Sequence, residues 1–195
     1  MNTAQIIEYT AAALALGGVG MMTMRMRLGW VLNFLSCLLY TWVFYNSKLY
    51  GDAALQIGFG VMQVWGWFQW KKKVSTDALK LRSLSFDGLW NSLLIALGGS
   101  LLLGLLLGAA TDTAVPWSDA FCTSGSLVAQ VLQIGRFRDN WTLWILVNLV
   151  YVPLYVYKGL TATAILYAVF LLMAVWGLWQ WNKKLRIERQ NQASA

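Results

Sequence analysis

Seven long apolar runs, separated by short polar stretches, set the pattern of the chain. They cover approximately residues 4–24, 28–45, 53–70, 88–110, 118–134, 141–157 and 160–181. A helix that crosses a lipid bilayer needs about 20 mostly apolar residues, and these runs leave almost no residues for a soluble domain. The pattern therefore predicts an all-α membrane protein with seven transmembrane helices.

An internal repeat organises these runs. Residues 30–73 align with residues 141–184 without a gap, and 17 of the 44 positions are identical. The same register extends more weakly into the preceding runs, where Arg25 meets Arg136 and Arg27 meets Arg138. Self-similarity at a fixed period indicates a repeated structural unit, so each unit is expected to contain three helices. The clearest identities are Trp30/Trp141, Tyr40/Tyr151, Trp65/Trp176, Gly66/Gly177, Gln69/Gln180 and Trp70/Trp181.

The run at 88–110 has no counterpart in the repeat. One additional crossing between two units of three helices gives both units the same orientation, related by an axis along the membrane normal. We therefore expect two parallel three-helix repeats joined by a linker helix. The expected division is 1–87 for the first repeat with a cytoplasmic loop, 88–117 for the linker helix with an outer loop, 118–184 for the second repeat and 185–195 for a cytoplasmic tail.

Charged residues make up only 12% of the chain, and their placement predicts its orientation. The segments after the first, third, fifth and seventh runs hold 13 of the 15 Lys and Arg residues, whereas the opposite side has only Lys48 and Lys158. Because cytoplasmic loops carry an excess of these residues, we expect a multi-pass protein of the cell inner membrane with its C-terminus in the cytoplasm and its N-terminus outside. This placement explains the net charge of +7 without a nucleic-acid partner.

Polar side chains inside the apolar runs indicate a site, because a polar group at bilayer depth costs free energy unless it is satisfied. In the run at 141–157, four aromatic residues and one amide fall on a single helical stripe, with the amide near mid-membrane. Pro153 lies in the same run and removes the backbone donor for the carbonyl of Leu149, so a kink is expected there. The stripe consists of Trp141, Trp144, Asn148, Tyr151 and Tyr155.

Neutral amides in other runs extend this stripe to a candidate site in which hydrogen-bonding groups surround an aromatic box. Two other interpretations stay open: an Asn at mid-span also holds helices together, and Trp residues near span ends form an interfacial belt. The candidate substrate-binding residues are Trp141, Trp144, Asn148, Tyr151, Gln130, Gln63, Gln56 and Asn33.

The chemistry that the chain lacks narrows its function. It contains no His, and Glu8, Asp52 and Asp119 all fall near the expected outer ends of the spans. No metal site, cofactor site, proton relay or catalytic pair is evident, which disfavours an enzyme and favours facilitated diffusion over gradient-driven symport. Aromatic faces and neutral amides suit a flat, polar, cationic small molecule. A non-transporting membrane scaffold or anchor subunit is the alternative from another class.

A family resemblance rests on two segments. The first is NWTLWILVN, from Asn140 to Asn148, with the following LYVYKGLTATAILYAVFLLMAVWGLWQW; the second is FYNSKLYGDAALQIGFGVMQVWGWFQW. The first resembles the PnuC vitamin transporters, whose sixth core helix carries a WxxWxxxN/D motif, and the second is similar to their second-to-third-helix region. The resemblance covers most of the chain, and Asn148 stands where some members have Asp.

The resemblance implies a fold similar to the SWEET sugar transporters and uptake of a vitamin precursor by facilitated diffusion, with trapping by phosphorylation inside the cell. It places Trp141, Trp144 and Asn148 at the family's substrate-binding positions. Members carry nicotinamide riboside, thiamine or riboflavin, and the first two are cationic heterocycles that suit an uncharged aromatic stripe. We therefore expect nicotinamide riboside first and thiamine second. Whether the chain forms a homo-oligomer stays open.

Overall fold

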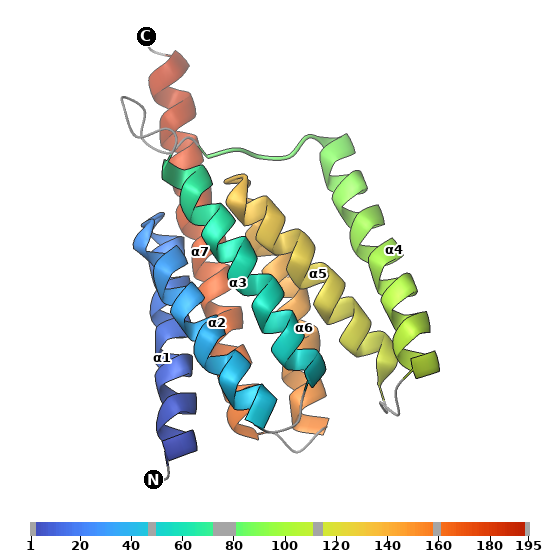
Figure 1. Cartoon of the computed structure of the whole chain (residues 1–195). Helices are drawn as coiled ribbons and strands as arrows, with labels where there is room; N and C mark the ends of the chain where they lie inside the picture. Colours follow the sequence, from blue (N-terminus) through green and yellow to red (C-terminus); the bar gives the residue numbers. More distant parts are fainter. Residues whose placement is uncertain (1–2, 47–49, 72–80, 111–114, 158–160, 194–195) are drawn as a thin grey trace. The chain divides into compact units, whose positions relative to one another are not determined.

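The computed structural model describes residues 3–46, 50–71, 81–110, 115–157 and 161–193 (Figure 1). Within these ranges the chain is helical, apart from short connections and one isolated β-bridge between Arg82 and Phe137. The expected basic residues Lys48, Lys72, Lys73, Lys80 and Lys158 lie outside the described residues. The helices are α1 (Thr3–Thr23), α2 (Leu28–Asn46), α3 (Tyr50–Lys71), α4 (Phe86–Ala110), α5 (Pro116–Ile134), α6 (Asn140–Tyr157) and α7 (Thr161–Ala193).

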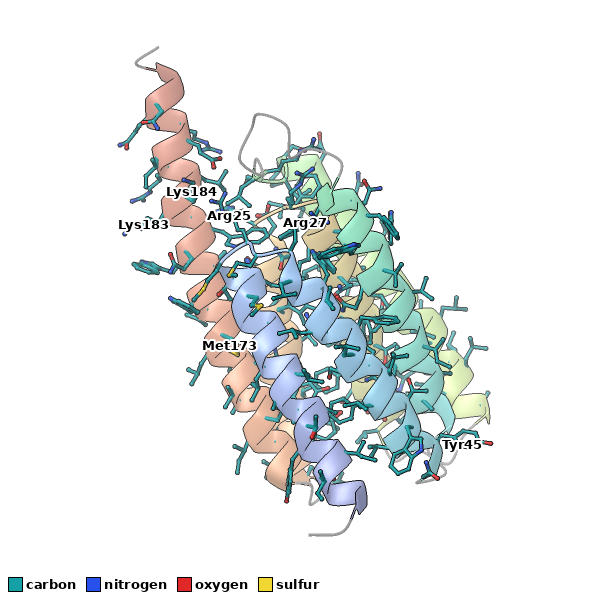
Figure 2. The ribbon with its side chains drawn as sticks, turned by 60° about the vertical axis from the view of Figure 1, so that its left-hand side comes forward. Arg25, Arg27, Tyr45, Met173, Lys183 and Lys184 are labelled. Carbon is teal, nitrogen blue, oxygen red and sulfur yellow. The ribbon has the colours of Figure 1, made fainter. Side chains whose placement is uncertain are left out.

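Each apolar run of the sequence forms one helix, and the expected ends agree within three residues except at the end of α7. Helix α7 contains 33 residues, about 50 Å at 1.5 Å per residue, whereas the hydrocarbon core of a bilayer is about 30 Å thick. Helix α7 is therefore longer than the hydrocarbon core, and its additional length consists of the polar residues that follow Trp181 and continue the helix through Ala193. Figure 2 shows Lys183 and Lys184 on this continuation, further along α7 than Met173.

Three of the helices are long and apolar enough to cross a membrane by length and composition alone, among the described residues. They are found at Ile6–Thr23, Phe86–Ala109 and Thr163–Asn191, and a shorter apolar stretch covers Leu28–Val43. Helices α3, α5 and α6 are less uniformly apolar because they carry amide side chains such as Gln63, Gln130 and Asn148.

The helices pack as two compact units, Met1–Lys80 and Leu81–Ala195. In the first unit α2 packs against both α1 and α3, and in the second unit α4, α5, α6 and α7 pack in sequence order. The linker helix α4 belongs to the second unit, where the Ser124 hydroxyl of α5 donates to the Ala96 carbonyl at 2.8 Å. Gly99 permits this close approach, because a Cβ there would lie 2.4 Å from the Ser124 hydroxyl oxygen.

The loops α1–α2 and α5–α6 have the same hydrogen-bonded geometry. Arg25 (φ 61°) and Arg136 (φ 62°) both take the left-handed conformation just after a helix. In each loop this residue and the next donate their N–H groups back to helix carbonyls, which is the Schellman pattern that ends a helix. The bonds are Arg25 to Met22 (3.0 Å), Met26 to Met21 (2.8 Å), Arg136 to Gln133 (3.0 Å) and Phe137 to Leu132 (2.9 Å). Equivalent bonds at aligned positions of the two units confirm the internal repeat.

A pair of buried tryptophans also repeats. The rings of Trp30 and Trp70 meet edge to face at 5.4 Å, and those of Trp141 and Trp181 at 5.6 Å. In each unit a glycine on the last helix, α3 or α7, makes room for the first ring of the pair, because a Cβ at Gly66 would lie 2.3 Å from Trp30 and one at Gly177 2.7 Å from Trp141. The sequence identities at these positions therefore maintain shared packing.

Candidate functional site

Helix α6 presents the amide that the sequence placed near mid-membrane. Asn148 is only 3% exposed, and its side-chain N–H donates to the Trp144 carbonyl one turn earlier at 2.7 Å. This is the one hydrogen bond of the Asn148 side chain among the described residues. Because the NH₂ group is engaged along the helix, the amide oxygen remains as an acceptor. Trp144 is half-buried and lies on the same stripe, so an aromatic side chain accompanies this acceptor.

Three tyrosines form a cluster one turn further along α6. Tyr151 and Tyr155 of α6 stack at 5.4 Å with an interplanar angle of 12°, and Tyr167 of α7 contacts them at 4.5 Å and 4.9 Å. Tyr167 was not among the candidates from sequence. The repeat contained a signal for it, because its register aligns Tyr167 with Gln56, which was a candidate.

Helix α5 contributes a buried polar face to the same unit. Gln130 is 4% exposed, and Ser126, one turn earlier, lies beside Tyr151. Helices α5 and α6 approach closely at Gly125, where a Cβ would lie 2.7 Å from the Val147 side chain. Gln130, Asn148 and Tyr151 therefore all lie on one pair of packed helices, α5 and α6.

Trp141 has different surroundings from the other stripe residues. It is 1% exposed and is enclosed by Trp181 and Gly177, just as Trp30 is enclosed by Trp70 and Gly66 in the first unit. This equivalence favours a packing role for Trp141. The aromatic face that α6 leaves accessible begins at the half-buried Trp144.

The remaining candidates lie in the first unit. Gln63 of α3 is buried, and its amide oxygen has no hydrogen-bond partner among the described residues. Asn33 of α2 lies against Gly18 of α1, where a Cβ would lie within 2.1 Å of the Asn33 amide oxygen, and Gln56 of α3 is half-buried. A buried amide oxygen without a donor costs free energy, so Gln63 is the most suitable of these three for a ligand.

Basic residues occupy one end of each unit. In the first unit Arg25 and Arg27 lie at the end opposite Tyr45 (Figure 2), and the Arg27 guanidinium lies 4.1 Å from the centre of the Trp67 ring. This cation–π contact holds a cation beside an aromatic side chain at the end of the helices. Among the described residues, no group of three or more His, Cys, Asp or Glu side chains is placed to bind a metal ion.

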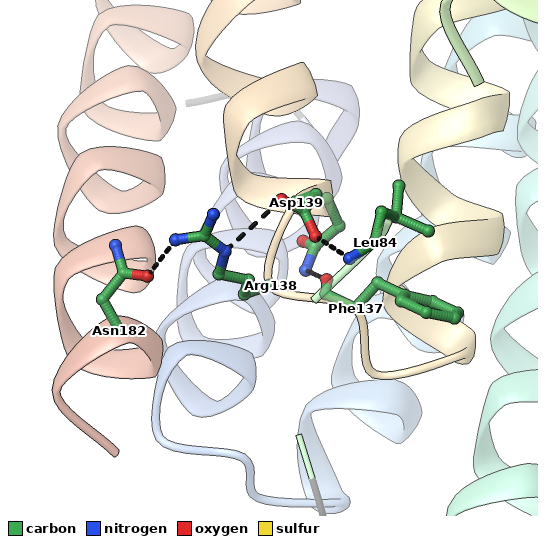
Figure 3. A network of polar contacts seen from close by, with 6 residues as sticks. Leu84, Phe137, Arg138, Asp139 and Asn182 are labelled. Carbon is green, nitrogen blue, oxygen red and sulfur yellow. Dashed lines mark hydrogen bonds and ion pairs between the residues drawn. The ribbon is translucent and has the colours of Figure 1, made fainter. Parts of the chain in front are cut away.

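At the corresponding end of the second unit, a polar network joins the α5–α6 loop, α7 and the segment before α4 (Figure 3). Arg138 donates to the Asn182 amide oxygen at 2.5 Å, and its Nε lies 3.4 Å from a carboxylate oxygen of Asp139. The other carboxylate oxygen of Asp139 accepts the Leu84 N–H at 2.7 Å. The guanidinium of Arg138 is therefore held in place by specific contacts.

Comparison with known proteins is consistent across sequence and structure. Residues 5–183 match the family described as nicotinamide mononucleotide transporter. The riboflavin/roseoflavin transporter RibM of Streptomyces davaonensis is 28% identical over 78% of this chain and 73% of its own length. The nicotinamide riboside transporter PnuC of Neisseria mucosa is 30% identical over 80% of this chain and 64% of its own length. PnuC of Escherichia coli K12 is 22% identical over 96% of this chain and 89% of its own length.

The fold is also that of a solved structure, described as the crystal structure of the vitamin B3 transporter PnuC. The two agree with a TM-score of 0.78 at 24% identity, over 92% of this chain and 82% of the other. The predicted all-α membrane fold, with three helices, a linker helix and three helices, is thereby confirmed, and so is the resemblance noted from the sequence. This multi-pass membrane protein belongs to the nicotinamide mononucleotide transporter family.

Proposed function

We propose that the protein takes up nicotinamide riboside, a vitamin B3 precursor, by facilitated diffusion. The observation that carries the proposal is the environment of Asn148, a buried amide whose NH₂ group is engaged by the Trp144 carbonyl and whose oxygen stays available as an acceptor. Nicotinamide riboside has a carboxamide NH₂ and ribose hydroxyls that donate to such an oxygen. The relatives from Neisseria mucosa and Escherichia coli, which are named nicotinamide riboside transporters, further support the proposal.

The aromatic groups around α6 suit the charge of this substrate. Its pyridinium ring is flat and cationic, and aromatic faces attract cations while they stack on heterocycles. Trp144 and the cluster of Tyr151, Tyr155 and Tyr167 provide such faces in the second unit. We assign the substrate-binding role to Trp144, Asn148, Tyr151 and Gln130 in the second unit, and to Gln63, Gln56 and Asn33 in the first, with Trp141 positioning α6.

Uptake is driven by the substrate gradient alone. Intracellular phosphorylation keeps that gradient by converting the entering nucleoside to an anion, which an uncharged aromatic site binds poorly. The orientation follows from the basic ends of the units, which we place in the cytoplasm. The C-terminal continuation of α7 is then cytoplasmic, the N-terminus of α1 lies outside, and the protein resides in the cell inner membrane.

A second candidate substrate is riboflavin, because RibM is 28% identical over 78% of this chain. Riboflavin is neutral and larger than nicotinamide riboside, so it gains less from the aromatic faces. Thiamine, a cationic heterocycle, is the third compound to compare.

The test uses purified full-length protein in liposomes without an ion gradient. Labelled nicotinamide riboside is expected to equilibrate across the membrane, and unlabelled substrate inside is expected to accelerate entry by exchange. Uptake of riboflavin or thiamine with no flux of nicotinamide riboside would show that the substrate is one of those two compounds instead. Absence of flux for all three would favour a non-transporting scaffold, and a requirement for a proton or sodium gradient would replace facilitated diffusion by symport.

A further inference from the structure

The segment before α4 and the α5–α6 loop bring two arginines together. The Arg82 N–H donates to the Arg136 carbonyl at 2.9 Å, and the Arg138 N–H donates to the Arg82 carbonyl at 2.8 Å. These two bonds form the isolated β-bridge of the second unit and fix the backbones of Arg82 and Arg136 beside each other. The Schellman turn at Arg136 fixes the loop from the other side.

The two guanidinium groups have different surroundings. The Arg82 guanidinium is centred 5.9 Å from the Phe137 ring, and the Nε atom of Arg136 is buried with no hydrogen-bond partner among the described residues. Burial and, second, the positive charge of Arg82 lower the pKa of Arg136. Both effects oppose the charged form of Arg136, and an anion would relieve both.

The acidic side chain of this loop is already engaged. Asp139 accepts the Leu84 N–H and pairs with Arg138, which in turn donates to Asn182 (Figure 3). No described carboxylate forms an ion pair with Arg82 or Arg136. Asp139 therefore neutralises Arg138, whereas Arg82 and Arg136 have no counter-ion within the described residues.

We propose that Arg82 and Arg136 bind a phosphate group, and that this phosphate belongs to the headgroup of an anionic phospholipid. Guanidinium groups present paired N–H donors that match phosphate oxygens. The pair lies where α5 ends and α6 begins, at the basic end of the membrane helices, and basic pockets at the cytoplasmic side of such helices bind lipid headgroups. Phe137, next to Arg82, adds an apolar side chain at the boundary with the acyl chains.

The site belongs to the second unit. In the first unit Arg25 has the same left-handed backbone, but the bridge that sets the Arg82 backbone beside that of Arg136 joins residues of the second unit. The proposal is independent of which solute is carried. It uses the orientation proposed above only to place the lipid in the cytoplasmic leaflet.

The test measures lipid binding to the full chain in a non-ionic detergent. Phosphatidylglycerol, phosphatidylcholine and inorganic phosphate are titrated separately, and binding is read from bound lipid in native mass spectra and from the thermal unfolding midpoint. Saturable binding of phosphatidylglycerol but not phosphatidylcholine is expected. The double variant R82Q/R136Q is expected to lower that affinity about tenfold or more, because two charge-assisted contacts are lost.

The matched control is R186Q/R189Q, which removes the same charge from exposed positions near the end of α7 and is expected to keep the affinity within about twofold. An equal loss in both double variants means diffuse surface attraction and overturns the proposal. Saturation by inorganic phosphate without binding of phosphatidylglycerol overturns the lipid assignment. Arg136→Lys keeps the charge but not the planar fork, so an unchanged affinity in this milder variant overturns the role of the guanidinium.

Discussion

The two three-helix repeats, α1–α3 and α5–α7, each have a hydrogen bond between their first two helices, and the two bonds run in opposite directions. In the first unit the Ser36 hydroxyl of α2 donates to the Ala11 carbonyl of α1 at 2.8 Å, whereas in the second unit the Cys122 thiol of α5 contacts the Val147 carbonyl of α6 at 3.9 Å. Ala11 and Cys122 are repeat partners, as are Ser36 and Val147. The same two positions thus join the same two helices with donor and acceptor exchanged.

The buried amides are exchanged in a similar way. Asn148 of α6 corresponds to Cys37 of α2, whereas Gln63 of α3 corresponds to Ala174 of α7. Each three-helix repeat therefore has one amide at these two positions. The amide lies on the second helix, α6, in the second repeat and on the third helix, α3, in the first repeat. The tryptophan and loop geometry is common to both units, so matching positions set the frame, whereas the amides of the candidate site occupy positions that differ.

The shared frame predicts the largest effect. Gly66→Ala and Gly177→Ala are each expected to lower the free energy of unfolding by about 1–3 kcal/mol, because the new Cβ would overlap the Trp30 or Trp141 ring. Thermal unfolding in detergent, followed by tryptophan fluorescence, measures the change. Gly58→Ala is the control, since a Cβ there meets no atom within 4 Å. Destabilisation in one unit only would break the equivalence of the two frames.

The exchanged amide on the second helix predicts a large effect on transport. Asn148→Ala is expected to reduce the rate of nicotinamide riboside entry into liposomes about 5- to 150-fold, because loss of one hydrogen bond to a bound substrate corresponds to about 1–3 kcal/mol. Cys37→Ala, at the repeat partner, is expected to change entry less than about twofold. Equal effects at the two positions would show that the asymmetry is unrelated to the substrate.

The exchanged amide on the third helix predicts a smaller effect. Gln63→Ala gives the first unit the residue that the second unit has at Ala174, and it is expected to raise the KM for entry about fivefold while leaving the unfolding midpoint unchanged or higher. The reason is that the Gln63 amide oxygen has no partner among the described residues, so its removal costs no hydrogen bond in the free protein. A lower midpoint with an unchanged KM would instead assign Gln63 to packing.

The exchanged donors predict the smallest effect. Ser36→Ala is expected to lower the free energy of unfolding by about 0.5–1.5 kcal/mol, because it leaves the buried Ala11 carbonyl without this donor. Cys122→Ala is expected to cost less, since a thiol at 3.9 Å is a weak donor. Chemical unfolding of both variants in the same detergent measures the difference. The reverse order would mean that the α5–α6 contact is the stronger of the two.

Most of the frame was predictable from the sequence, because lipid imposes a simple rule on helices. Apolar runs of sufficient length had to become helices whose backbone groups bond internally, and the internal repeat grouped them in threes. The end of α7 was less predictable, since its last turns are polar and the apolar pattern contains no signal for them. The different surroundings of Trp141 and Trp144 needed the structure, although the repeat contained a signal: Trp141 aligns with Trp30, whereas Trp144 aligns with Asn33. Only the contacts show that Gly177 and Trp181 enclose Trp141.

The sequence by itself determined the helices, the repeat, the family and the presence of an amide within an aromatic stripe, since these depend on hydrophobicity and spacing along one chain. Tertiary structure decided which of those side chains are enclosed and which atoms have partners. It brought Tyr167 to Tyr151 and Arg82 to Arg136, left the Gln63 oxygen without a partner among the described residues, and engaged Asp139 with Leu84. The physical reason is that these contacts join helices and segments distant in sequence, so they form only when the packed helices fix the distance between them.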